Sequence, residues 1–158
     1  MASADAVYTI YKNKEREEFL VYPESKLINQ TMALYSMISS GLMVGSELNG
    51  ICQFNIGISR DVSYGGEFDS VVRDECKNVT VINDEESKFR LLLSGRIDMI
   101  ASNQRSASYF INKFGKHDEV RMHAPVLHTG ARYLAFSNKS PHVDLVDAFD
   151  KAIRNADR

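Results

Sequence analysis

The chain has 158 residues, a formal net charge of −2 and a pI near 6.1, a length that suits one domain or one and a fraction. Its hydrophobic content of 44% and charged content of 25% are ordinary for a globular protein. The near-neutral charge argues against a nucleic-acid binder, and no apolar run approaches the length of a transmembrane helix.

The N-terminal part of the chain consists of short apolar runs separated by polar turns, a pattern typical of strands. A charged segment, residues 12–18 (KNKEREE), predicts a turn or short helix between the first two runs. The predicted strands cover residues 5–10, 19–22 and 31–38.

Residues 53–101 alternate between strand and helix patterns in the order β-α-β-α-β, with strands over 53–58, 79–82 and 97–101 and a first helix over 64–76. Strands joined by helical crossovers lie parallel in a sheet that is covered on both faces. This order predicts an α/β domain.

The second helix of this segment has its own start and stop signals. Asn83 and Glu86 are spaced as a capping box, and Gly95 stands where a helix C-terminus needs positive φ. The predicted apolar stripe is Phe89, Leu92 and Leu93, which leaves Glu85, Lys88 and Arg90 mostly off it.

The C-terminal part predicts a helix over residues 103–114, a strand over 132–136 and a final helix. Ser140 and Pro141 provide the N-cap and first residue of that last helix. Its apolar stripe is Leu145, Val146, Phe149 and Ile153.

The sequence contains few candidates for covalent or metal chemistry. Cys52 and Cys76 adjoin apolar segments, which favours buried free thiols, whereas a disulfide requires their Cα atoms within about 7 Å. The four histidines have no metal-ligand spacing, and no catalytic triad, P-loop or GxGxxG motif is present. We therefore expect no enzyme activity, no metal and no cofactor.

Four segments resemble the bacterial extracellular solute-binding proteins of family 3, the periplasmic amino-acid receptors of ABC transporters. They are DAVYTIYKNKEREEFLVY, ICQFNIGISRDVSYGGEFDS, LLLSGRIDMIASNQRSASYFI and ARYLAFSNKSPHVDLVDAFDKAI. The Glu-Arg pair at 15–16 matches the segment before the family's first hinge, and GRID at 95–98 matches a G-R-x-D pattern in its second lobe. RYLAFSNKS matches the returning hinge strand.

The resemblance implies a periplasmic-binding-protein-like lobe with about five mostly parallel strands flanked by helices, plus hinge-like strands and a C-terminal helix. Residues 1–158 are expected to form one α/β domain. Within it, residues 31–129 correspond to a complete second lobe, and residues 1–30 and 130–158 to remnants of the first lobe and hinge. Most of the first lobe is expected to be absent.

The family binds the ligand carboxylate with an arginine whose planar fork matches two oxygens. The resemblance places Arg16 in this role and Asn13 where the family has a threonine; the alternative for Arg16 is a solvated charge in a charged run. Ser59, Ser63 and Tyr64 occupy the family's polar ligand loop, although Ser63 is also a candidate N-cap.

Asn103 stands where amino-acid binders carry an aspartate for the ligand ammonium group. An amide cannot supply that charge, and Asn103 is also a candidate N-cap of the following helix.

The expected function is non-catalytic binding of a small polar or anionic ligand, an amino acid or a small carboxylate, with an ABC permease or a sensor as partner. The opening residues form no signal peptide; by resemblance the compartment is periplasmic, and the alternative is cytoplasmic. The alternative function is a truncated lobe that forms a homodimer through Phe19, Leu20, Leu134, Phe136 and Phe149.

Overall fold

The computed structural model describes residues 4–156 and divides the chain into two compact units. The central unit is Thr31–Thr129, and the terminal unit combines Met1–Gln30 with Gly130–Arg158. Within the described residues, no helix has both the length and the apolar character needed to cross a membrane.

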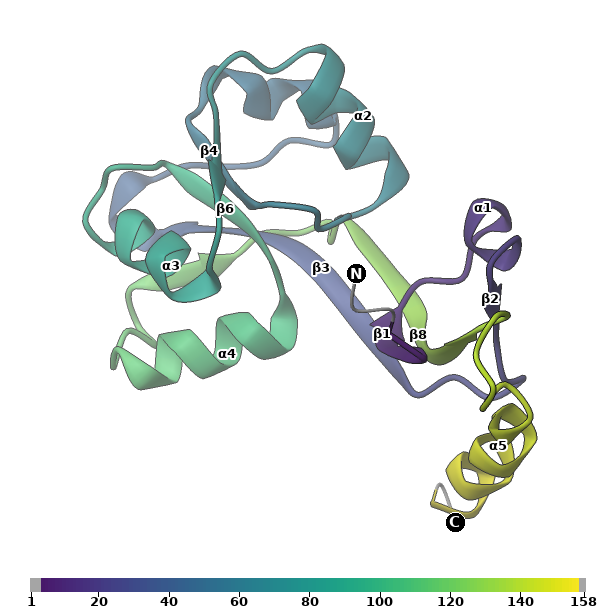
Figure 1. The fold of residues 1–158 in the computed structure, drawn as a ribbon. Helices are drawn as coiled ribbons and strands as arrows, with labels where there is room; N and C mark the ends of the chain where they lie inside the picture. Colours follow the sequence, from purple (N-terminus) through teal and green to yellow (C-terminus); the bar gives the residue numbers. More distant parts are fainter. Residues whose placement is uncertain (1–3, 157–158) are drawn as a thin grey trace. The chain divides into compact units, whose positions relative to one another are not determined.

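The sheet of the central unit is mixed (Figure 1). Strand β4 (Ile56–Ser59) pairs in parallel with β5 (Val79–Ile82) and β6 (Met99–Asn103). Strand β3 (Ile28–Met37) pairs antiparallel with β6 and with β7 (Val120–Met122). The expectation of a mostly parallel sheet is therefore wrong: only β4, β5 and β6 are linked by helical crossovers, which parallel pairing requires.

Helices cover both faces of this sheet, as the apolar strands require. Helix α2 (Gly66–Asp74) packs on one face, and α3 (Glu85–Leu93) and α4 (Gln104–Lys113) pack on the other (Figure 1). Side chains alternate between the faces with a period of two: Leu34 joins the α2 core and Tyr35 the α3–α4 core. The α/β class is thus confirmed.

Two predictions about α3 are wrong and one is confirmed. The N-cap is Asp84, whose carboxylate accepts a hydrogen bond from the Ser87 N–H at 2.8 Å, and not Asn83. Lys88 is fully buried instead of lying off the core face. Gly95 has φ of 69°, as a helix stop requires.

Cys52 and Cys76 form a disulfide, so the expectation of free thiols is wrong. Cys52 belongs to the 3-10 helix η2 (Leu48–Gln53), and Cys76 follows α2. Because η2 packs against α2, the two Cα atoms lie 4.5 Å apart. A short 3-10 helix, η1 (Ile38–Ser40), precedes this segment and ends at Gly41.

Replacing both cysteines with alanine should lower the free energy of unfolding by about 3.5 kcal/mol, because the cross-link removes loop entropy from the unfolded chain. Urea denaturation measures the loss. Dithiothreitol should destabilise the wild-type protein by a similar amount and leave the double variant unchanged. A wild-type midpoint that does not move under full reduction would contradict the expected stabilisation.

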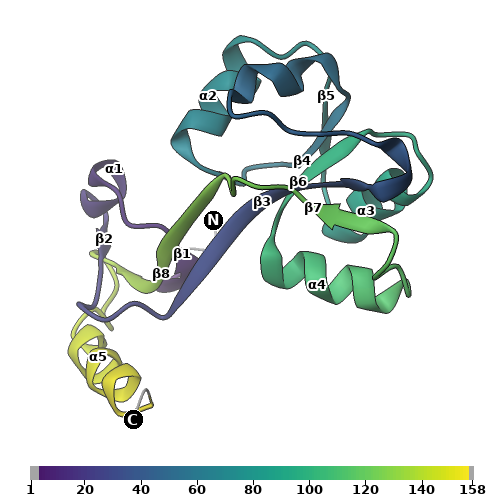
Figure 2. The same ribbon diagram turned by 180° about the vertical axis from the view of Figure 1, so that it is seen from behind.

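The terminal unit contains the remaining strands and helices (Figure 2). Strands β1 (Ala6–Ile10) and β2 (Leu20–Val21) pair antiparallel with β8 (His128–Ser137), and helix α1 (Lys14–Glu17) joins β1 to β2.

Helix α5 (Leu145–Ala156) closes this unit and begins later than the sequence predicts. Ser140 instead caps a preceding turn, accepting a hydrogen bond from the His142 N–H at 3.0 Å. The helix is held by Asp150, which accepts from the Ser25 N–H at 2.7 Å and pairs with Arg154 at 2.6 Å. The hydrogen bond to Ser25 is the main reason that the pKa of Asp150 is lowered.

Candidate functional site

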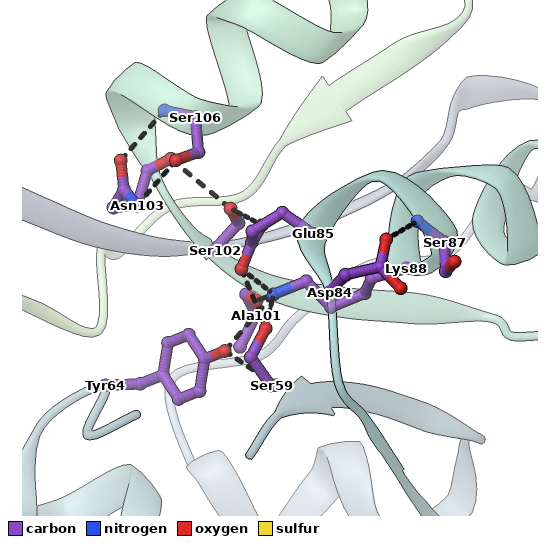
Figure 3. A network of polar contacts seen from close by, with 10 residues as sticks. All are labelled: Ser59, Tyr64, Asp84, Glu85, Ser87, Lys88, Ala101, Ser102, Asn103 and Ser106. Atoms are coloured by element: carbon purple, nitrogen blue, oxygen red, sulfur yellow. Dashed lines mark hydrogen bonds and ion pairs between the residues drawn. The ribbon is translucent and has the colours of Figure 1, made fainter. Parts of the chain in front are cut away.

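Polar side chains gather at the carboxyl ends of β4 and β6 in the central unit (Figure 3). Ser59 is the last residue of β4, and Ser102 lies near the end of β6. Helix α3 adds Glu85 and Lys88, and Tyr64 precedes α2. Open α/β sheets bind ligands at this edge, where strand ends and helix starts meet.

Lys88 is the centre of this network, although it is fully buried. Its Nζ lies 2.6 Å from Glu85 Oε1, 2.7 Å from the Ala101 carbonyl, 2.8 Å from Ser59 Oγ and 3.2 Å from the Tyr64 hydroxyl. An ammonium group has three N–H donors, so these four acceptors satisfy it completely. A buried lysine is tolerated only with such pairing.

Glu85 connects the buried ammonium to the surface. Its Oε1 accepts from Ser59 Oγ at 2.7 Å as well as from Lys88, and its Oε2 accepts from Ser102 Oγ at 3.0 Å. The Glu85 side chain is 26% exposed. Because Lys88 and Glu85 have opposite charges, the network has no net charge. Its hydrogen bonds hold two serine hydroxyls and one partly accessible carboxylate in fixed positions.

The structure brings Ser59 and Tyr64 together but leaves Ser63 outside the network. The Tyr64 hydroxyl accepts from the Ser59 N–H at 2.9 Å, and the Tyr64 side chain is only 1% exposed. The buried Tyr64 side chain therefore stabilises the end of β4 through this hydrogen bond. Ser63 is exposed, and its hydroxyl donates to the carboxylate of Asp69 in the first turn of α2. It does not cap the helix backbone, because the N-cap of α2 is Gly65.

Asn103 is the N-cap of α4. Its side-chain oxygen accepts from the Ser106 N–H at 2.8 Å, and its amide nitrogen donates to Ser106 Oγ at 2.9 Å. Asn103 is half-buried and directly follows Ser102, so it lies at the same strand end as the network.

Asn13 and Arg16 belong to the terminal unit. Asn13 is exposed and caps α1 by accepting from the Arg16 N–H at 2.8 Å. The half-buried Arg16 donates from Nη1 to the Tyr11 carbonyl at 3.0 Å. Among the described residues, no carboxylate forms a salt bridge with Arg16.

The sequence did not predict the roles of Glu85, Lys88 and Ser102. A usable signal was present, because Glu85, Lys88 and Leu92 are spaced i, i+3, i+7 and share one helix face. Across residues 4–156, no cluster of His, Cys, Asp and Glu could hold a metal ion.

Comparison with known proteins gives structural matches only. No family model and no curated protein matches the sequence. Holo ArgBP from T. maritima superposes with a TM-score of 0.76 at 13% identity, covering 95% of this chain and 62% of that one. An ancestral arginine-binding protein bound to arginine has a TM-score of 0.76 at 17% identity, covering 97% and 66%.

The VFT2 domain of Bordetella pertussis BvgS also matches, with a TM-score of 0.66 at 18% identity over 94% of this chain and 60% of that domain. The chain thus spans less than two thirds of the length of these structures. At such identities the likeness establishes the fold. The expected resemblance to solute-binding protein family 3 is confirmed at this level: the chain has the α/β periplasmic-binding-protein-like fold of the amino-acid-binding proteins of ABC transporters.

Proposed function

We propose that this chain is a non-catalytic solute-binding module of an ABC-type transport or sensing system, and that it binds a small polar or anionic ligand. The observation that carries the proposal is the occurrence, on this fold, of Arg16 without a carboxylate partner among the described residues. A guanidinium in that state offers a ligand carboxylate two parallel hydrogen bonds.

The polar edge of the central unit supports the same function. Ser59 and Ser102 present hydroxyls that Glu85 and Lys88 hold in place, and Asn103 adds an amide beside them. Rigid, internally supported polar groups at the carboxyl ends of strands suit orientation of a small ligand. These polar groups can orient a ligand without a covalent step, which suits a non-catalytic binding function.

The matched structures and the disulfide support a class of partner and a compartment for this chain. One matched structure is the substrate binding protein of an amino acid ABC transporter, which supports a transporter permease as the partner. Another is a domain of BvgS, which supports a sensor as the alternative. The Cys52–Cys76 disulfide favours an oxidising compartment, as the periplasm is.

Thermal unfolding in the presence of single compounds tests the proposal. The panel contains L-arginine, L-glutamate, L-glutamine, glutarate and acetate at matched ionic strength. A ligand at a hundred times its Kd should add about 2.7 kcal/mol, or roughly 5–10 °C in Tm. The absence of a shift with every compound would contradict solute binding.

The second candidate is a homodimerising interaction protein, favoured by apolar side chains of the terminal unit. Phe19, Leu145 and Phe149 are 50%, 43% and 42% exposed. The expectation that Phe136 is exposed is wrong, because it is 4% exposed and packs against Phe149 with ring centroids 5.6 Å apart.

Light scattering at micromolar concentration is expected to give the mass of a dimer under this second candidate, because exposed apolar patches drive association. Phe149→Ser should convert that dimer to a monomer, and the exposed Lys139→Ser should not. A wild-type protein that scatters as a monomer would exclude this candidate.

A further inference from the structure

Arg132, on β8 of the terminal unit, is a buried cation that the site described above does not use. The residue is 7% exposed, and its guanidinium Cζ lies 3.0 Å from the centroid of the Tyr11 ring. Its Nε is buried without a hydrogen-bond partner, and it forms no salt bridge within residues 4–156. Stacking on an aromatic face stabilises a guanidinium but satisfies none of its five N–H donors.

The guanidinium of Arg16, which also has no salt bridge within the described residues, contacts the same tyrosine. Arg16 donates to the Tyr11 carbonyl at 3.0 Å, while Arg132 covers the Tyr11 ring. Burial and the charge of Arg16 both lower the pKa of Arg132, with burial the larger cause. Lys12, which follows Tyr11 in the sequence, is paired with Glu17 at 3.2 Å.

The buried charge of Arg132 is costly in a folded protein, because a buried charge needs a partner of opposite sign. The half-buried Arg16 adds a second positive charge and supplies no acid. The face of the Arg132 guanidinium is covered by Tyr11, so its N–H donors are directed along its edge. An edge of this kind matches the two oxygens of a carboxylate.

Building on the solute-binding function proposed above, we propose that Arg132 is a second anion-binding residue beside Arg16, and that the ligand is a small dianion. One anionic group pairs with each guanidinium. Dicarboxylates and inorganic phosphate share this chemistry.

Competitive thermal unfolding and calorimetry test the assignment with matched pairs of compounds. Glutarate should bind at least about tenfold more tightly than its monoamide glutaramate, and L-glutamate more tightly than L-glutamine, because one charge-assisted pair is lost in each amide. Arg132→Gln should remove this preference. Lys139→Gln, an exposed lysine of the same unit, should keep it.

The unliganded Arg132→Gln variant should unfold at the same or a higher temperature than the wild type, because the substitution removes an unpaired buried charge. A purely structural cation would give a lower Tm together with an unchanged preference for glutarate, and that result would overturn the assignment. Equal binding of glutarate and glutaramate by the wild type would also overturn it. Inorganic phosphate binding as tightly as glutarate would support the dianion class and identify a free anion as its source.

Should Arg132→Gln fail to fold, arginine side-chain NMR of the wild type replaces it. Glutarate is expected to shift two Nε–Hε resonances and glutaramate one; a single shift with both compounds would overturn the assignment. These failures are distinct from failure of the proposed function, since a protein that binds L-glutamine as tightly as L-glutamate is still a solute-binding protein.

Discussion

Replacing Lys88 with methionine should lower the free energy of unfolding by about 3–5 kcal/mol, the cost of breaking a buried ion pair from one side. The loss leaves the Glu85 carboxylate without its cation. It also removes the donor to Ser59 Oγ, the Tyr64 hydroxyl and the Ala101 carbonyl. Methionine fills a similar volume, so the change measures polar pairing more than packing.

Urea denaturation gives the magnitude, and Lys77→Met, at an exposed lysine of the same unit, is the matched control with an expected change within about 0.5 kcal/mol. In the double variant Glu85→Gln/Lys88→Met, the loss should be smaller than the sum of the single losses by about 0.5–3 kcal/mol, because the two side chains are in direct contact. Additive losses would show that Lys88 and Glu85 do not stabilise each other.

Replacing Arg16 with alanine should weaken binding of a carboxylate ligand by roughly thirtyfold or more, the usual result of removing one partner of a desolvated charge pair. The unliganded protein should lose no more than about 1 kcal/mol, because within residues 4–156 the Arg16 side chain makes a single hydrogen bond, to the Tyr11 carbonyl. Calorimetric titration separates these two effects from each other.

Lys14→Ala is the control for Arg16→Ala, since Lys14 is an exposed cation in the same short helix. This variant should bind the ligand within about threefold of the wild type. If Arg16→Ala also retained that affinity, Arg16 would be a solvated surface charge and would not be part of the binding site.

The segment from β5 to α4 shows which features a sequence can predict. The β-branched run of β5, the apolar stripe of α3 and Gly95 at its end are local signals, and each corresponds to an observed element. The observed N-cap is Asp84 and the predicted one was the preceding residue, Asn83, because either side chain can accept the capping hydrogen bond. Local chemistry thus predicted the elements and the C-terminal end of α3, but not the residue at which α3 begins.

The helical spacing of Glu85, Lys88 and Leu92 indicates that they share one face of α3. The other members of the polar network could not be predicted, because their contacts join residues distant in sequence. Lys88 lies beside Ser59 and Ala101 only after α3 packs on the sheet. The disulfide has the same origin, since Cys52 and Cys76 meet only when η2 packs on α2. The antiparallel pairing of β3 with β6 is likewise set by tertiary structure.

The most direct test of solute binding is isothermal titration of the wild-type protein with the compound that gives the largest shift in Tm. We predict saturable binding of one ligand per chain, with an affinity that falls with Arg16→Ala and not with Lys14→Ala. The absence of saturable heat for every compound of the panel would contradict the proposed function.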